Sequence, residues 1–186
     1  MRSSSFLMAM ALFCGAVGAS AQTPLPSFAT EQSTAGWMSI PEPLARTLVA
    51  SGDKTDRELV DEAIKGDGLA RNYRQFFRAR KTALAVSGPP ALFVRPASDP
   101  HYTPFYGAHI FRFWFISSTG NVLLASAADK VSVLDSVHAG MHDLAVSQCH
   151  GGACYDTTEV FEHGKYRDAT CSTRSLDTGQ TSAGCP

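Results

Sequence analysis

The sequence predicts an α+β fold in which N-terminal helices pack on a mainly antiparallel sheet of hairpins, with a disulfide-stapled C-terminal segment. Three observations support this fold class. Apolar residues recur at helical spacing between residues 41 and 66, and from residue 82 onward the chain consists of short apolar runs separated by turn residues. Four of the five cysteines lie between residues 149 and 185.

Residues 1–21 are expected to be a cleavable secretory signal peptide. Arg2 supplies a positive charge, Phe6–Val17 is an almost unbroken apolar run, and Ala19-Ser20-Ala21 is a site of the kind that signal peptidase cleaves. The apolar run is shorter than the roughly 20 residues that a membrane-spanning helix needs. We therefore expect a mature chain that starts near Gln22, is periplasmic or secreted, and does not span a membrane.

Length and charge limit the domain organisation and the class of partner. The mature chain of about 165 residues suits one domain. We expect a flexible N-terminal segment over residues 22–40, rich in Pro, Ser and Thr, and a single α+β domain over residues 41–186. Sixteen Lys and Arg residues against 17 Asp and Glu residues give a net charge of -1. No nucleic-acid partner is expected, because nucleic-acid binding favours a strongly basic surface.

Two helices are expected at the start of the domain. Pro41-Glu42-Pro43 can form the first turn of the first helix, because proline is tolerated there, and Ser51-Gly52-Asp53 ends it. Thr55 and Glu58 have the spacing of a capping box, so the second helix is expected to begin at Thr55. Gly66 is expected to end the second helix.

The region Leu69–Lys81 alternates basic and aromatic residues, and we expect it to be helical at its start and a strand from about Phe77. The basic side chains can cover core aromatic rings with their aliphatic stems while their charges face solvent. The alternative is a basic surface for an anionic partner.

Seven short runs rich in Val, Ile, Leu and Phe are predicted as strands. In the run His109–Ile116, a period of two places three phenylalanines on one face, and Trp114 and Ile116 on the other. Because both faces are largely apolar, this strand is expected to be central, and the turn at Thr119-Gly120-Asn121 to return it as a hairpin. The seven runs are 83–86, 91–94, 108–116, 121–126, 131–134, 144–147 and 158–161.

The cysteines of the mature chain are expected to form two disulfides, because an even number of cysteines in an exported chain indicates a disulfide framework. Three pairings are possible. We favour Cys149–Cys154 and Cys171–Cys185, because each closes a short loop containing Gly, Ser, Thr or Asp. A zinc site is the alternative, but the cysteine spacings fit the usual structural zinc patterns poorly. No metal or other cofactor is expected.

The stretch Leu134–Val146 resembles the turn-strand unit of integrin-like FG-GAP or VCBS repeats, whose pattern is D-x-[DN]-x-D-G-x-x-D-L-x-V. The matching positions are Gly140, Asp143, Leu144 and Val146. Val160–Arg167 looks like the strand-turn-strand that follows such units in small exported bacterial proteins. The resemblance implies a compact β-rich domain of blade-like hairpins. Val137 and Ala139 stand where the family has calcium ligands, so calcium is not expected.

No catalytic residue is predicted. His138 and His142 have the spacing of two metal ligands on a helix, but the glycine between them favours a turn. Glu159, Glu162 and Asp168 are interspersed with surface-type residues and are expected to be solvated. Any two carboxylates can nevertheless meet in the folded chain, so a carboxylate-based hydrolase stays open.

An aromatic loop is the remaining indication of function. Tyr102, Phe105 and Tyr106 are predicted binding residues, because exposed aromatic side chains on loops are typical of binding surfaces. The alternative is that Phe105 and Tyr106 cover the edge of the core. We expect an exported non-enzymatic binding protein, such as an inhibitor or immunity-type protein, whose partner is a protein or an envelope component.

Two other functions stay open. One is a cell-envelope hydrolase with a histidine and carboxylate site assembled by folding, which predicts a concave pocket that holds a histidine with a carboxylate partner. The other is a structural accessory subunit of an envelope complex, which predicts an exposed apolar patch.

Overall fold

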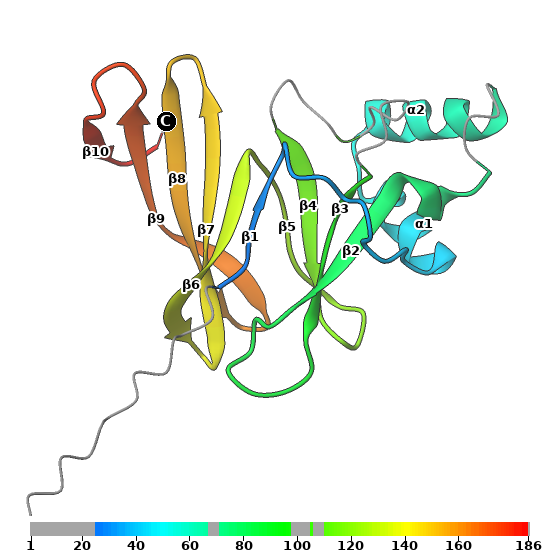
Figure 1. Ribbon diagram of the computed structural model, residues 1–186, viewed down its shortest axis with the longest axis horizontal. Coiled ribbons are helices and arrows are strands. Elements are labelled where there is room, and N and C mark those ends of the chain that lie inside the picture. Colours follow the sequence, from blue (N-terminus) through cyan, green and yellow to red (C-terminus); the bar gives the residue numbers. More distant parts are fainter. Residues whose placement is uncertain (1–24, 67–70, 98–104, 106–109, 186) are drawn as a thin grey trace, which may run out of the picture.

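The computed structural model describes residues 25–66, 71–97, 105 and 110–185, which form two antiparallel sheets and two α-helices (Figure 1). The four-stranded sheet has the order β2-β3-β4-β5, and the six-stranded sheet has the order β1-β6-β7-β8-β9-β10. The first contains β2 (Phe77–Thr82), β3 (Ala91–Pro96), β4 (Phe111–Ile116) and β5 (Val122–Ala128). The second contains β1 (Ser27–Ala29), β6 (Lys130–His138), β7 (Met141–His150), β8 (Ala153–Glu162), β9 (Lys165–Ser175) and β10 (Thr181–Ala183). The mainly antiparallel organisation is confirmed, with two sheets in place of one; the predicted signal peptide lies outside the described residues.

The first helix and the helix-to-strand transition follow the sequence prediction. Helix α1 (Glu42–Ala50) begins after Pro41 and has a second proline in its first turn. A short 3-10 helix, η1 (Tyr73–Phe76), leads directly into β2 at Phe77. Neither α-helix in the described part of the chain is long and apolar enough to cross a membrane.

The second helix, α2 (Lys54–Lys65), has a different N-terminal cap from the one predicted. The side chain of Asp53 accepts a hydrogen bond from the backbone N–H of Asp56 at 2.8 Å. The prediction of Thr55 as the cap was wrong, because the aspartate two residues earlier supplies an acceptor that suits this position equally well. Gly66 follows the last helical residue, as predicted.

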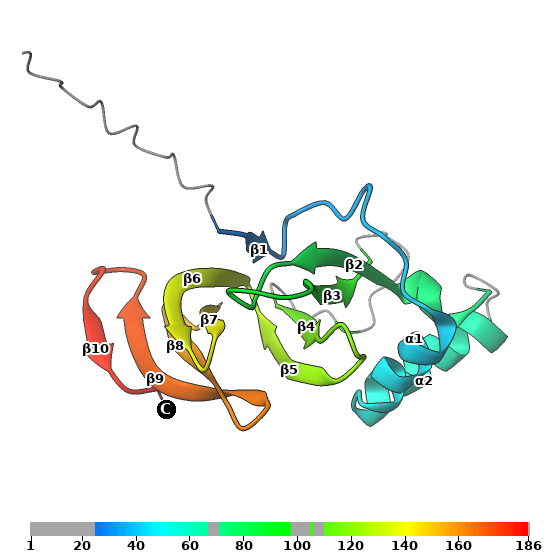
Figure 2. The same cartoon turned by 90° about the horizontal axis from the view of Figure 1, so that it is seen from below.

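Strand β4 lies between two hydrophobic cores. Its three phenylalanines belong to an inter-sheet core, which lies between the two sheets and includes Phe93, Leu144 and Val146. Trp114 and Ile116 belong to a helix-side core, which also contains side chains of α1 and α2. The central position of β4 is confirmed, because it pairs with both β3 and β5. Figures 1 and 2 show the six-stranded sheet on one side of the four-stranded sheet and the helices on the other.

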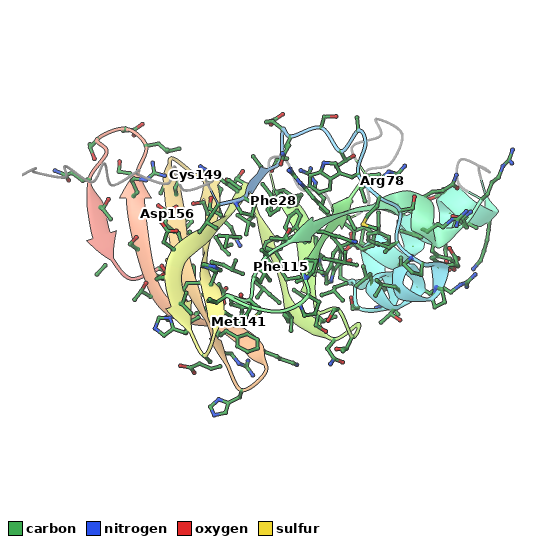
Figure 3. The ribbon with its side chains drawn as sticks, turned by 60° about the horizontal axis from the view of Figure 1, so that its bottom comes forward. Phe28, Arg78, Phe115, Met141, Cys149 and Asp156 are labelled. Carbon is green, nitrogen blue, oxygen red and sulfur yellow. A yellow bond between two sulfur atoms is a disulfide. The ribbon has the colours of Figure 1, made fainter. Side chains whose placement is uncertain are left out.

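The described part of the N-terminal segment, residues 25–40, is packed against the sheets, whereas a flexible segment was expected over 22–40. Strand β1 pairs with β6, and the fully buried ring of Phe28 stacks on Phe93 with the ring centroids 3.8 Å apart. The buried guanidinium of Arg95 donates hydrogen bonds of 2.6 and 2.9 Å to the carbonyls of the two residues after Phe28. Composition alone suggested flexibility because these contacts come from residues far away in the sequence. Figure 3 shows Phe28 and Phe115 in the region between the sheets.

Residues 83–86, predicted as a strand, instead belong to the connection between β2 and β3 and are hydrogen-bonded to the six-stranded sheet. They contain one isolated bridge, between Ala85 and Met141 of β7. The backbone N–H of Val86 donates to the carbonyl of Gly140 at 3.0 Å, and the carbonyl of Leu84 accepts from the N–H of His142 at 2.7 Å. These bonds hold the β2–β3 connection against the β6–β7 hairpin.

The chain passes from the four-stranded sheet to the six-stranded sheet through a single residue, Asp129. Strand β5 ends at Ala128 and β6 begins at Lys130. The backbone N–H of Asp129 donates to the carbonyl of Ser147 at 2.8 Å, and its carboxylate accepts a hydrogen bond from the backbone N–H of Cys149. Hydrogen bonds to Ser147 and Cys149, near the end of β7, therefore hold the junction in place.

Candidate functional site

The inner face of the six-stranded sheet changes from apolar to polar along its length. Cross-strand partners share a face, so β7, β8 and β9 form rows of side chains. The rows, from the core outward, are Leu144–Glu159–Asp168, Val146–Thr157–Cys171 and Gln148–Tyr155–Thr173. Because Leu144 and Val146 belong to the inter-sheet core, the polar members of these rows lie on the same face next to it. Figures 1 and 2 show that β8, β9 and β10 extend away from the four-stranded sheet.

A polar groove of about 300 Å³ lies on this face. It is lined by Val146, Gln148, His150, Tyr155, Thr157, Asp168, Cys171 and Cys185. The rings of His150 and Tyr155 lie against each other, with centroids 4.7 Å apart. The Gln148 side-chain amide donates a hydrogen bond of 2.6 Å to the carbonyl of Ala127 in β5, so one wall of the groove is tied to the other sheet. The groove thus combines an aromatic surface with fixed hydrogen-bonding groups.

A pair of carboxyl groups lies beside the polar groove. The side chain of Glu159 hydrogen-bonds that of Asp168, which lines the groove. Burial, then the hydrogen bond and the negative charge of Asp168, raises the pKa of Glu159 to about 7. The folded state therefore favours the protonated form of Glu159 well above the pH at which a free glutamate ionises.

The prediction that all three carboxylates of this region are solvated was wrong for Glu159. Glu162 and Asp168 are exposed, but Glu159 is only 5% exposed. Its own charge and the polar residues Thr157 and Thr158 before it gave no sign of burial. The sequence does contain a signal for the burial of Glu159. Phe161 packs against the inter-sheet core, and Glu159, two residues earlier on the same strand, lies on the same face.

The free energy of unfolding is expected to fall as the pH rises from about 4.5 to about 7, because the folded state retains a proton on Glu159 that the unfolded chain loses. The group's pKa is higher in the folded state, so its ionisation opposes folding above this range. Glu159→Gln keeps a hydrogen-bond donor toward Asp168 but cannot ionise, and it should remove a pH-dependent loss on the order of 3 kcal/mol. Urea unfolding between pH 4 and pH 8 measures this slope.

The matched control for this experiment is Glu162→Gln, an exposed carboxyl on the same strand. We expect Glu162→Gln to show the same dependence of the free energy of unfolding on pH as the unmodified protein. Equal slopes for Glu159→Gln and the unmodified protein would contradict a protonated Glu159 in the folded state.

The histidine with a carboxylate partner lies away from the polar groove. His138 Nδ1 and Asp143 Oδ1 are 2.7 Å apart, with Asp143 buried and the His138 side chain 55% exposed. His138 pairs with Met141 and Val137 pairs with His142, so the two histidines lie on opposite faces of the hairpin. The turn interpretation is therefore confirmed. Within the described ranges, no group of three or more His, Cys, Asp or Glu residues is arranged to hold a metal ion.

Both favoured disulfides are present. Cys149 and Cys154 are direct cross-strand partners on β7 and β8, and their sulfurs are bonded. Cys171 of β9 is bonded to Cys185, which follows β10. The stapled C-terminal segment is thus confirmed. Cys171 and Cys185 form part of the groove lining, whereas Cys149–Cys154 joins β7 to β8 on the opposite face of the sheet. Figure 3 shows Cys149 and Asp156 in this part of the six-stranded sheet.

Replacing Cys171 and Cys185 together by serine is expected to lower the free energy of unfolding by about 3 kcal/mol, because the crosslink restricts the unfolded chain over a sequence separation of 14 residues. Urea unfolding of the double variant measures this loss. As a control, a reducing agent should destabilise the unmodified protein more than the double variant, which keeps only Cys149–Cys154. A double variant as stable as the unmodified protein would contradict a stabilising role for this disulfide.

The predicted aromatic binding loop is placed only in part. Tyr102 and Tyr106 lie outside the described residues. Phe105 is 5% exposed and belongs to the helix-side core, where its ring centroid lies 5.3 Å from that of Phe77 and 5.8 Å from that of Trp114. The structure therefore favours the core alternative for Phe105, since a buried ring cannot form part of an exposed binding surface.

Comparisons with known proteins gave no match to a family, to a curated protein or to a solved structure. The resemblance to FG-GAP and VCBS units therefore stays a prediction. Function has to be argued from the polar groove and the carboxyl pair beside it.

Proposed function

We propose that this protein is an exported, non-enzymatic binding protein whose ligand site is the polar groove of the six-stranded sheet. The observation that carries the proposal is one concave surface that combines an aromatic ring with amide, hydroxyl and carboxylate groups on rigid strands. Ligand sites are typically preformed concavities in which a few placed polar groups set the orientation of the ligand. Of the predicted binding residues, Phe105 is buried, and Tyr102 and Tyr106 lie outside the described residues, so the proposal rests on the groove.

The strands that carry the polar groove support binding without a large ordering cost. Cys149–Cys154 and Cys171–Cys185 crosslink the segments that form its lining. Rigid side-chain frameworks lose less conformational entropy when they bind a ligand. Disulfides also suit the proposed location in the periplasm or outside the cell, because such bonds persist in oxidising compartments. With a protein as the ligand, this function is that of an inhibitor or immunity-type protein.

The experiment is amide-shift mapping of the ¹⁵N-labelled exported protein during titration with separate protein and glycan fractions of the cell envelope. We expect saturable shifts at the amides of groove residues such as Gln148 and Tyr155. Thr157→Ala should weaken binding, whereas Thr158→Ala, one residue along but on the opposite face of β8, should not. If neither fraction perturbs the groove amides, the proposal is wrong.

A hydrolase is the second candidate, and the carboxyl pair is the observation that favours it. Glycoside hydrolysis uses one carboxylic acid with a raised pKa as proton donor and a second carboxylate opposite it. Glu159 has a raised pKa, and a second carboxyl group, that of Asp168, lies next to it. Binding is the stronger proposal, because a general acid must reach its substrate and Glu159 is almost fully buried. Release of reducing ends from envelope glycan, lost in Glu159→Gln, would establish the hydrolase.

A further inference from the structure

We infer that the polar groove binds a neutral carbohydrate. This inference rests on the proposed function, since it names the ligand class of the same site. It follows from the chemistry of the groove lining, from the orientation of its aromatic ring and from the sign of the nearby charge. Each of these excludes a different class of ligand.

The lining matches a ligand with many hydroxyl groups. Gln148, Thr157 and Asp168 supply an amide, a hydroxyl and a carboxylate, which together accept and donate hydrogen bonds. A sugar hydroxyl is both donor and acceptor and can pair with each of them. The side-chain nitrogen of Gln148 donates a hydrogen bond to the Ala127 carbonyl. The side-chain oxygen of Gln148 is therefore the acceptor that can bind a ligand hydroxyl.

The aromatic ring matches the apolar face of a sugar. His150 lies against Tyr155 in the groove, with ring centroids 4.7 Å apart, and so holds the tyrosine ring in place. An aromatic ring offers a flat apolar face with a polar tip, and a pyranose ring offers C–H groups on one face and hydroxyls at its edge. The other apolar lining is Val146 and one disulfide, so the groove has no deep apolar pocket for a large hydrophobic side chain of a peptide.

The charge of the groove disfavours anionic ligands. The groove lining contains Asp168 and neither Lys nor Arg, with His150 as its one basic side chain, and Glu159 adds a second carboxyl group beside it. Phosphate, sulfate and uronate groups are recognised by cationic side chains or clustered backbone N–H groups, and a carboxylate repels them. A carboxylate accepts hydrogen bonds from neutral hydroxyls readily. The groove volume of about 300 Å³ is at the lower end of the range for small-molecule sites, which suits a short oligosaccharide.

The experiment titrates the ¹⁵N-labelled exported protein with cellotetraose, chitotetraose and maltotetraose, and with tetragalacturonate as the anionic comparison. We expect saturable shifts at groove amides with at least one neutral probe and none with tetragalacturonate. Tyr155→Ala should weaken the binding constant about tenfold, and Tyr155→Phe, which keeps the ring, should stay within about threefold. The amide spectrum of each variant shows whether it is folded.

The outcomes separate this inference from the proposed function. If the envelope protein fraction shifts the groove amides and no neutral oligosaccharide does, the binding function stands and the carbohydrate inference is wrong. If neither the fractions nor the oligosaccharides shift those amides, both are wrong. Stronger binding of tetragalacturonate than of every neutral probe also overturns the inference.

Discussion

Replacing Phe93 by alanine is expected to lower the free energy of unfolding by about 3–5 kcal/mol. The ring is fully buried in the inter-sheet core. Its centroid lies 3.8 Å from that of Phe28, 5.1 Å from that of Phe115 and 5.8 Å from that of Phe113. The substitution leaves a cavity between two sheets that cannot close around it, because β3 is held on both sides by hydrogen-bonded strands. Urea unfolding followed by tryptophan fluorescence measures the loss.

The control for this prediction is Phe161→Ala, at the partly buried margin of the same core. It removes the same atoms but exposes the cavity to solvent, so we expect less than half of the loss at Phe93. A loss below about 1 kcal/mol at Phe93 would show that the two sheets do not depend on this ring for their packing.

Replacing Arg95 by methionine is expected to lower the free energy of unfolding by about 3–5 kcal/mol and to release the N-terminal segment. The guanidinium is fully buried, lies 4.3 Å from the Phe111 ring centroid and donates to the carbonyls of Ala29, Thr30 and Gln32. Methionine keeps much of the volume but leaves these carbonyls without the donor, and an unsatisfied buried polar group costs about 1–3 kcal/mol. Unfolding measurements and limited proteolysis of the segment before Trp37 test both effects.

Arg78→Met is the matched control, because Arg78 is the direct cross-strand partner of Arg95. Its guanidinium donates to the carbonyls of Gln75 and Phe77, close to it in the sequence, so we expect a loss below about 1 kcal/mol and no new cleavage. If the segment in Arg95→Met resists proteolysis as in the unmodified protein, Arg95 is not what holds it.

The parts of the fold that could be predicted are those with local signals. The period of two in β4 located a central strand because both of its faces are filled by apolar residues that are neighbours in the sequence. Proline at the start of α1 and glycine after α2 act within one helical turn. The cysteine pairs are close in the sequence, so their spacing favoured the pairing that is present.

The parts that could not be predicted depend on distant contacts. Strand β1 has one buried residue, Phe28, whose stacking partner is Phe93, and a single apolar residue among polar ones carries no periodic signal. Strand β8 is longer than the predicted run 158–161, and β9 was not among the seven predicted runs, because polar residues continue the pairing beyond the core. The polar groove depends on this continuation, so its residues looked like ordinary surface residues. Glu159 shows the same effect, since its burial comes from the fold around it.

The single-residue junction at Asp129 has a mechanical consequence. A one-residue connection limits rotation of the two sheets against each other. The hydrogen bonds of Asp129 to β7 hold this connection at the strand where the groove begins. The lining of the groove comes from the six-stranded sheet and the segment after it, and the bond from Gln148 to Ala127 joins that sheet to β5, so the groove is formed when the chain folds. We expect recognition to work by selection of ligands that already fit, with association limited by diffusion and orientation and with no slow closing step.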